Sequence, residues 1–161
     1  MSTAPERVAA LAAVLRERRL MLATAESCTG GLIAAACTAL AGSSDWFERG
    51  FVTYSNAAKT EMLGVPPDLI ARHGAVSAEV AIAMAVGALA RSRADWSVAV
   101  TGIAGPGGAT PGKPVGTVWL AIAGKGVPAQ AELLQLDGDR GSIRSQTVER
   151  ALQRLLDALR A

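Results

Sequence analysis

The 161-residue sequence contains a single histidine, His73. One histidine excludes metal sites built from several histidines, and a zinc site would have to combine it with Cys28, Cys37 and a carboxylate at no recognised spacing. A Ser-His-Asp triad would also need His73, which stands between two helical patterns with no nucleophile near it in the sequence. We therefore expect no metal and no other cofactor, and we interpret His73 as a surface or helix-end residue.

Cysteine is almost as scarce, since Cys28 and Cys37 are the only two. If one helix holds both, about 13 Å separates them along its axis, whereas a disulfide requires Cα atoms within about 7 Å. The first residues show no basic segment followed by an apolar stretch, so we expect no export signal. Reduced thiols without an export signal predict a cytoplasmic protein.

Long apolar runs and an excess of one charge are also missing. The longest nearly apolar run covers residues 32–41, whereas a membrane-spanning helix needs about 20 residues. Lysine and arginine number 16 against 14 aspartates and glutamates, and this net charge of +2 is too balanced for a surface that binds nucleic acid or membranes. The one basic cluster, Arg16, Arg18 and Arg19, is explained by cations at the end of a first helix. We expect neither nucleic acid nor a membrane as a partner.

Helical patterns alternate with short β-favouring stretches, which predicts an α/β protein. The predicted helices cover residues 5–19, 30–41, 56–63, 78–93 and 142–159, and the predicted strands cover residues 20–25, 47–54, 96–101, 117–123 and 131–136. The last two strands are too close in sequence for a parallel crossover, so part of the sheet must be antiparallel. We expect residues 1–161 to form a single three-layer α/β/α domain on a mixed, mostly parallel sheet of about five strands.

Polar residues follow three of these strands. They are residues 26–31, residues 54–56 with Lys59, and Thr101 with the glycine-rich stretch that runs to residue 116. In open α/β sheets, ligands bind outside the carboxyl ends of the strands. If these three strands run parallel, the three clusters meet at one edge of the sheet.

Ser27 is the first candidate for chemistry. A serine at a strand-to-helix turn can present its hydroxyl at the sheet edge, and the backbone N–H groups near residues 28–30 could then face a developing oxyanion. The alternative is that Ser27 is only the N-cap of the following helix. Cys28 is a rival nucleophile, although a small buried apolar residue is its commoner role.

Lys59 and Tyr54 are the candidate proton carriers. Lys59 falls near a predicted helix N-terminus, where a positive charge is unfavourable. It therefore either points into solvent or is favoured in its neutral form, which is the form that a lysine base requires. With no suitable histidine, Ser27 with Lys59 is the most economical nucleophile and base, and Tyr54 is a hydrogen-bond relay between them. Otherwise the base must be Tyr54 or a carboxylate such as Glu26.

The glycine-rich stretch after Thr101 can cradle an anion with its backbone N–H groups, or it can be a plain connection between two strands. Residues 107–113 read G-x-x-x-x-G-K, like a phosphate-binding P-loop. Pro114 follows where such a loop requires serine or threonine, and a strand follows instead of a helix, so we reject this motif.

Five motifs occur in order along the chain. They are residues 25–31 (AESCTGG); residues 52–56 (VTYSN) followed by Lys59 and residues 63–65 (LGV); residues 74–77 (GAVS); residues 100–108 (VTGIAGPGG) with residues 113–118 (KPVGTV); and residues 138–140 (GDR) before Ile143 and Arg144. Together they resemble the C-terminal domain of competence/damage-inducible protein A (CinA), the nicotinamide-nucleotide amidohydrolase family. The departures are Ala109, where glycine is expected, and Gly112, where an acidic residue is expected.

The resemblance implies hydrolysis of the carboxamide of nicotinamide mononucleotide to nicotinic acid mononucleotide and ammonia. It implies Ser27, Tyr54 and Lys59 as catalytic residues, and a glycine loop that holds the ribose and phosphate with Thr101 and Gly102 near the amide. Arg140 then either pairs with the phosphate or forms a loop salt bridge with Asp137 or Asp139. The remaining residues expected to bind the small-molecule nucleotide are Cys28, Thr29, Gly30, Gly31, Asn56 and Gly105. We also expect a homo-oligomer.

Two other functions stay open. A non-catalytic nucleotide-binding or regulatory module of the same fold would keep the glycine loop but would have no use for Ser27 and Lys59 together. An amidase for another small amide would keep the chemistry and change the substrate. The resemblance covers the C-terminal domain alone, so it implies no activity of the larger N-terminal domain that some members of the family carry.

Overall fold

The computed structural model describes residues 3–161, and residues 1 and 2 lie outside this part. Five strands form one sheet in the order β2-β1-β3-β4-β5. The strands are β1 (Leu22–Glu26), β2 (Phe47–Val52), β3 (Trp96–Gly102), β4 (Thr117–Gly124) and β5 (Val127–Gln135). β1 pairs in parallel with β2 and β3, whereas β4 pairs antiparallel with both β3 and β5. β5 therefore runs with β3, so β4 is the one strand of the five that runs the other way, and the predicted mixed, mostly parallel sheet is confirmed.

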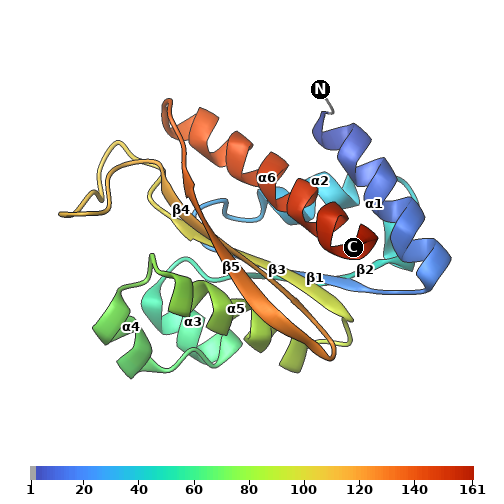
Figure 1. Ribbon diagram of the computed structural model, residues 1–161, viewed down its shortest axis with the longest axis horizontal. Coiled ribbons are helices and arrows are strands. Elements are labelled where there is room, and N and C mark those ends of the chain that lie inside the picture. Colours follow the sequence, from blue (N-terminus) through green and yellow to red (C-terminus); the bar gives the residue numbers. More distant parts are fainter. Residues whose placement is uncertain (1–2) are drawn as a thin grey trace.

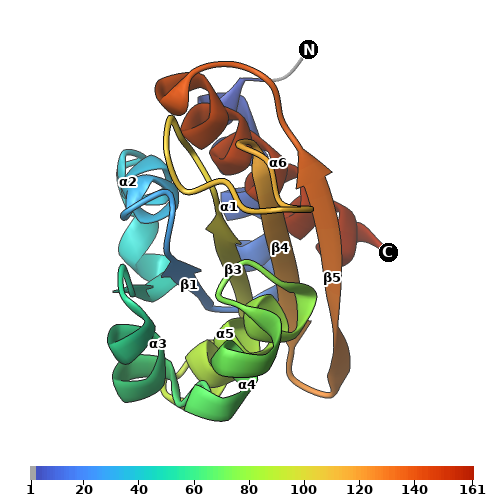
Figure 2. The same cartoon turned by 90° about the vertical axis from the view of Figure 1, so that its left-hand side faces the viewer.

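Helices cover both faces of this sheet. Figure 1 shows α1 (Ala4–Arg18), α2 (Leu32–Thr38) and α6 (Arg140–Arg160) on one face, and α3 (Asn56–Leu63), α4 (Pro67–His73) and α5 (Ala78–Ala90) on the other. Figure 2 shows β1, β3, β4 and β5 side by side between these layers. A short 3-10 helix, η1 (Ser43–Asp45), precedes β2. The three-layer α/β/α arrangement is confirmed, and no helix within residues 3–161 is long and apolar enough to cross a bilayer.

The two faces of β3 and β4 belong to two separate hydrophobic cores. On β3 and β4, the large side chains of Val98, Val100 and Leu120 face α1 and α6, whereas Ala99 and Ala121 face α5. Successive residues of a strand point to opposite faces, so this alternation separates two cores. The alanine face lets α5 approach the sheet closely, and β1 is buried along its whole length between the two layers.

Several predicted boundaries differ from the structure by a few residues, and those of β5 and α6 have a clear physical reason. β5 begins at Val127 rather than at residue 131, because the hairpin turn is only Lys125 and Gly126. Pro128 falls in an irregular part of the β4–β5 pairing on an edge strand, where a residue without N–H is tolerated. α6 begins at Arg140 rather than at residue 142, because the Asp139 side chain accepts a hydrogen bond from the Ser142 N–H and caps the helix.

Candidate active site

The carboxyl ends of β1, β2 and β3 meet at one edge of the sheet. The Ser27 N–H donates a hydrogen bond to the Val100 carbonyl oxygen at 3.1 Å, and the Thr53 N–H donates to the Glu26 carbonyl oxygen at 2.9 Å. These bonds continue the parallel pairing just beyond the strands. Ser27, Lys59 and Thr101, which come from the three predicted clusters, therefore line a single pocket of about 290 Å³.

Lys59 reaches Ser27 directly. Its Nζ lies 3.1 Å from Ser27 Oγ and 3.2 Å from the Thr53 carbonyl oxygen. The Lys59 side chain is only 3% exposed, so the alternative that it points into solvent is wrong. Burial lowers the pKa of the Lys59 ammonium group below its usual value, because desolvation disfavours the charged form.

Lys59 Nζ donates to both the Thr53 carbonyl oxygen and Ser27 Oγ. When the amine has lost a proton, it can keep the bond to the Thr53 carbonyl and turn its lone pair toward the Ser27 hydroxyl, which then donates. The arrangement can therefore accept the hydroxyl proton of Ser27 and so make its oxygen a nucleophile.

Ser27 is not a helix cap. α2 begins at Leu32, and residues 28–31 form a turn in which Gly30 and Gly31 have φ angles of 58° and 109°. The buried Glu26 carboxylate caps α2 instead, because it accepts hydrogen bonds from the N–H groups of Ile33 (2.8 Å) and Ala34 (3.0 Å). The hydroxyl of Ser27 is therefore left for Lys59.

The turn after Ser27 leaves three of its backbone donors without a partner within residues 3–161, namely the N–H groups of Cys28, Thr29 and Gly31. The Gly30 N–H donates to the Ser27 carbonyl oxygen at 3.0 Å, so it is occupied. Burial raises the pKa of the Cys28 thiol to about 11, which keeps it protonated near neutral pH and disfavours it as a nucleophile.

Three residues expected to bind substrate lie outside the pocket lining. They are Thr29, Gly30 and Gly31. Thr29 is fully buried, and its hydroxyl donates to the Glu26 carboxylate at 2.5 Å. The two glycines supply the positive φ angles of the turn, which other residues rarely adopt. The structure thus gives the side chain of Thr29 and the two glycines a part in shaping the turn, and it leaves the backbone N–H of Thr29 without a hydrogen-bond partner within residues 3–161.

Arg140 and Tyr54 pair at the rim of the pocket. Arg140 Nη2 donates to Tyr54 Oη at 2.8 Å, and Arg140 Nη1 donates to the Gly105 carbonyl oxygen at 2.8 Å. Within residues 3–161 Arg140 makes no ion pair with Asp137 or Asp139, so the loop salt bridge is not formed. Nor does Tyr54 hydrogen-bond to Ser27 or Lys59 there, so the structure provides no relay through its ring.

The connection between β3 and β4 forms the pocket's other wall, and Figure 1 shows it extending from the left end of the molecule. The Thr101 hydroxyl donates to the Ala75 carbonyl oxygen at 2.9 Å, and this bond holds the segment before α5 against the pocket. A Cβ at Gly102 would come within 2.6 Å of Val118, so only glycine fits there. The pocket lining also contains Asn56, Gly102 and Gly105, which are among the residues expected to bind substrate.

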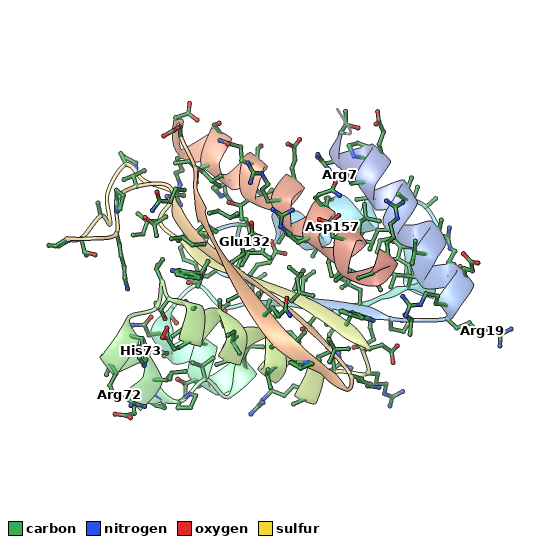
Figure 3. The ribbon with its side chains drawn as sticks, in the orientation of Figure 1. Arg7, Arg19, Arg72, His73, Glu132 and Asp157 are labelled. Carbon is green, nitrogen blue, oxygen red and sulfur yellow. The ribbon has the colours of Figure 1, made fainter. Side chains whose placement is uncertain are left out.

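The remaining polar candidates lie outside the pocket. His73, labelled in Figure 3, is the last residue of α4. Its Nδ1 lies 3.3 Å from a carboxylate oxygen of Glu79. Lys113 Nζ donates to the His73 carbonyl oxygen at 2.9 Å, and β4 follows this loop as expected. Within residues 3–161, no three histidine, cysteine or acidic side chains cluster so as to hold a metal.

Two residues near the pocket were given no structural role from the sequence. Glu26, considered only as a possible base, caps α2. The sequence signal for a structural role was a charged residue at the end of an otherwise apolar strand. Arg144 donates from Nε and Nη2 to the carbonyl oxygens of Cys28 and Thr29, each at 3.1 Å. It lies four residues after Arg140, on the same face of α6, and that spacing could have indicated it.

Comparison with known families and proteins agrees with this architecture. The family model described as "CinA C-terminal domain" matches residues 5–159. A CinA-like protein of Akkermansia muciniphila is 58% identical over 146 residues, which are 91% of this chain but only 35% of that protein. The chain thus spans about a third of the CinA-like proteins that it matches.

Shorter relatives match over most of their length. A protein of Pseudomonas putida named nicotinamide-nucleotide amidohydrolase PncC is 57% identical, over 88% of this chain and 88% of that protein. The PncC of Escherichia coli is 51% identical, over 88% and 86%. The crystal structure of competence/damage inducible protein CihA from Agrobacterium tumefaciens superposes with a TM-score of 0.95 at 47% identity, covering 100% of this chain and 98% of that one.

Proposed function

We propose that this chain, which belongs to the CinA C-terminal domain family, hydrolyses the carboxamide of nicotinamide mononucleotide to nicotinic acid mononucleotide and ammonia. The observation that carries the proposal is the 3.1 Å contact between Lys59 Nζ and Ser27 Oγ, with the amine buried. The relatives named nicotinamide-nucleotide amidohydrolase PncC support the choice of substrate, because they match the chain over most of their own length.

Ser27 is the nucleophile and neutral Lys59 is the base. As Ser27 Oγ bonds to the amide carbon, its proton passes to Lys59 Nζ, and the carbonyl oxygen takes the negative charge. The free N–H groups of Cys28 and Thr29 are the candidate donors to that oxygen. Lys59 then returns the proton to the departing nitrogen, which leaves as ammonia and gives an ester on Ser27. Water, deprotonated by Lys59, cleaves this ester and restores the Ser27 hydroxyl.

Arg140 binds the phosphate. Its guanidinium hydrogen-bonds only to uncharged acceptors within residues 3–161, the Gly105 carbonyl and the Tyr54 hydroxyl, so its charge is not neutralised there. The pocket lining contains one arginine, Arg140, and no acidic side chain. A guanidinium can hold a phosphate through two parallel hydrogen bonds. Tyr54, which is 61% exposed, orients Arg140 and forms the pocket rim.

The glycine-rich wall receives the ribose. Gly105, Gly107 and Gly108 line the pocket next to Arg140, and the absence of side chains leaves room for a sugar between the phosphate and the amide. Asn56 and Thr101 lie on the same lining, with Thr101 fixed by its bond to Ala75. These positions support a binding mode with the amide at the Ser27 end of the pocket and the phosphate at the Arg140 end.

The test is ammonia release by the purified protein with nicotinamide mononucleotide, nicotinamide riboside and free nicotinamide at matched concentrations. We expect nicotinic acid mononucleotide and ammonia in equal amounts, and much slower release from the two compounds that lack phosphate. Release from another small amide but not from the mononucleotide would make the chain a different amidase. Tight binding of the mononucleotide without any ammonia would make it a non-catalytic nucleotide-binding module. Either result overturns the proposal.

A further inference from the structure

Arg144 joins α6 to the turn that carries Ser27. From the second turn of α6, its Nε donates to the Cys28 carbonyl oxygen and its Nη2 to the Thr29 carbonyl oxygen, both at 3.1 Å. The side chain is partly buried, and within residues 3–161 it forms no ion pair with a carboxylate. One guanidinium thus holds two consecutive peptide carbonyls immediately after the nucleophile.

Holding a carbonyl also sets the direction of an N–H group. In a planar trans peptide the C=O and the N–H of the next residue point in opposite directions. The bond to the Cys28 carbonyl therefore directs the Thr29 N–H away from Arg144, and the bond to the Thr29 carbonyl does the same for the Gly30 N–H. The Gly30 N–H meets the Ser27 carbonyl, whereas the Thr29 N–H stays free.

Two backbone bonds close the turn, from the Gly30 N–H to the Ser27 carbonyl oxygen and from the Leu32 N–H to the Thr29 carbonyl oxygen, but neither holds the peptide plane between Cys28 and Thr29. Gly30 and Gly31 adopt left-handed φ angles, and glycine explores many backbone conformations at little cost. Glu26 restrains the far side of the turn through the Thr29 hydroxyl and the first amides of α2. The Thr29 carbonyl oxygen also accepts a bond from the Leu32 N–H at 3.1 Å, whereas the Cys28 carbonyl oxygen is held by Arg144 alone within residues 3–161.

We propose that Arg144 is a positioning residue for catalysis: it fixes the peptide planes after Ser27 so that the Thr29 N–H remains available to the developing oxyanion. This inference rests on the proposed function, because it assigns Ser27 as the nucleophile. Without the two bonds, the Cys28–Thr29 peptide can rotate and present its carbonyl oxygen where a donor is needed. A misplaced donor affects the transition state more than the bound substrate, so kcat falls while KM changes little.

The variants are Arg144→Met, which removes both bonds, and Arg144→Lys, which keeps the charge but not the planar fork. Arg154→Lys is the matched control. Arg154 lies on the same helix and binds Glu132 through two nitrogens, but it lies outside the pocket lining. Figure 3 labels Glu132 and Asp157 beside α6. We expect Arg144→Met to lower kcat roughly 100-fold with KM within threefold of wild type. We expect the kcat of Arg144→Lys to lie between those of wild type and Arg144→Met. The kcat of Arg154→Lys should stay within twofold of the wild-type value.

A substrate-independent readout separates this inference from the proposed function. A fluorophosphonate probe forms a bond between phosphorus and Ser27 Oγ, releases fluoride and passes the hydroxyl proton to Lys59, and it too develops negative charge on an oxygen. We expect the labelling rate of Ser27 to fall in Arg144→Met by about the same factor as kcat, at equal folded fraction measured by thermal unfolding. If Arg144→Met does not fold, the same comparison of kcat and labelling rate is made with Arg144→Lys.

Equal labelling rates in wild type and the Arg144 variants, or a loss of activity that appears only as a raised KM, would overturn the positioning role and leave the proposed function standing. A clear labelling contrast in a protein that releases no ammonia from any nicotinamide compound would overturn the proposed function and leave the positioning role standing. A wild-type protein that the probe does not label would overturn both.

Discussion

At the scale of single residues, the three lysines occupy three different environments. Lys59 is buried against Ser27, Lys113 binds the His73 carbonyl oxygen outside the pocket, and Lys125 lies 3.4 Å from an Asp95 carboxylate oxygen at the β4–β5 turn. Lys113, the other lysine near the glycine-rich wall, is therefore directed away from the reacting centre. Lys59 is left as the lysine that can exchange a proton with Ser27.

Replacing Lys59 by arginine tests its role as a base. Arginine keeps a positive charge but does not give up its proton near neutral pH, so Lys59→Arg should lose at least roughly 100-fold in kcat. In the wild type, kcat/KM should rise with pH through an apparent pKa below 10.5, because burial lowers the Lys59 pKa and only the neutral amine is active. The measurement is ammonia release from pH 6 to 10. Most of the wild-type activity remaining in Lys59→Arg would show that Lys59 is only an electrostatic contact.

The same pKa change predicts a signed effect on stability. Unfolded Lys59 releases its proton near 10.5, whereas the folded protein releases it at a lower pH. Between these two values the unfolded state binds more protons, so the free energy of unfolding rises with pH. Measured by urea unfolding, wild type should gain stability relative to Lys59→Met as pH rises towards 10. Lys125→Met controls for the loss of one lysine. A stability difference between wild type and Lys59→Met that does not change with pH would contradict the lowered pKa.

Removing Arg140 tests the phosphate assignment. Charged hydrogen bonds contribute about 1.5–3 kcal/mol, so Arg140→Met should raise KM for nicotinamide mononucleotide roughly 10- to 100-fold. Its effect on nicotinamide riboside should be much smaller, because that compound has no phosphate. Comparing the two substrates cancels any change caused by losing the bonds to Tyr54 and Gly105. An equal effect on both substrates would place the phosphate elsewhere.

At the scale of elements, the turn from β1 to α2 separates what the sequence predicts from what it does not. The pairing of Ser27 with Lys59 was predicted from the order of the strands and from the shortage of other bases. The helix start was misplaced, because the capping group is Glu26, which lies seven residues before the amide of Ile33 that it binds. Local capping rules look for a side chain two or three residues away, so they point to Ser27 instead.

α5 and α3 meet at a glycine that sets how closely they pack. A Cβ at Gly87 would come within 2.0 Å of the Leu63 carbonyl oxygen, which is backbone and cannot rotate away. Alanine stabilises an isolated helix by about 1 kcal/mol relative to glycine. Even so, Gly87→Ala should lower the free energy of unfolding by about 1–3 kcal/mol, because the added Cβ forces the two helices apart. Val86→Ala, on the exposed side of α5, should change it by less than about 0.5 kcal/mol. A Gly87→Ala protein as stable as wild type in urea unfolding would refute this packing.

At the scale of the whole molecule, the α/β class, the three layers and the mixed sheet could be predicted from the alternation of patterns and one short hairpin. The contribution of α6 to the site could not be predicted from local patterns, and Arg140 was expected there only from the family resemblance. Arg140 and Arg144 are more than 80 residues from Tyr54 and Cys28 in the sequence, and only the folding of α6 over the sheet brings them together. Such long-range contacts leave no local pattern, so the sequence suggests Tyr54 as a hydrogen-bond relay, whereas in the structure its hydroxyl accepts a bond from Arg140.

One measurement tests the central claim most directly: the rate of ammonia release from nicotinamide mononucleotide by Ser27→Ala beside wild type. The account predicts a loss of at least roughly 1,000-fold. It also predicts a melting temperature close to that of wild type, because the Ser27 hydroxyl caps no helix. A Ser27→Ala protein that is fully folded and releases ammonia within threefold of the wild-type rate would contradict the account.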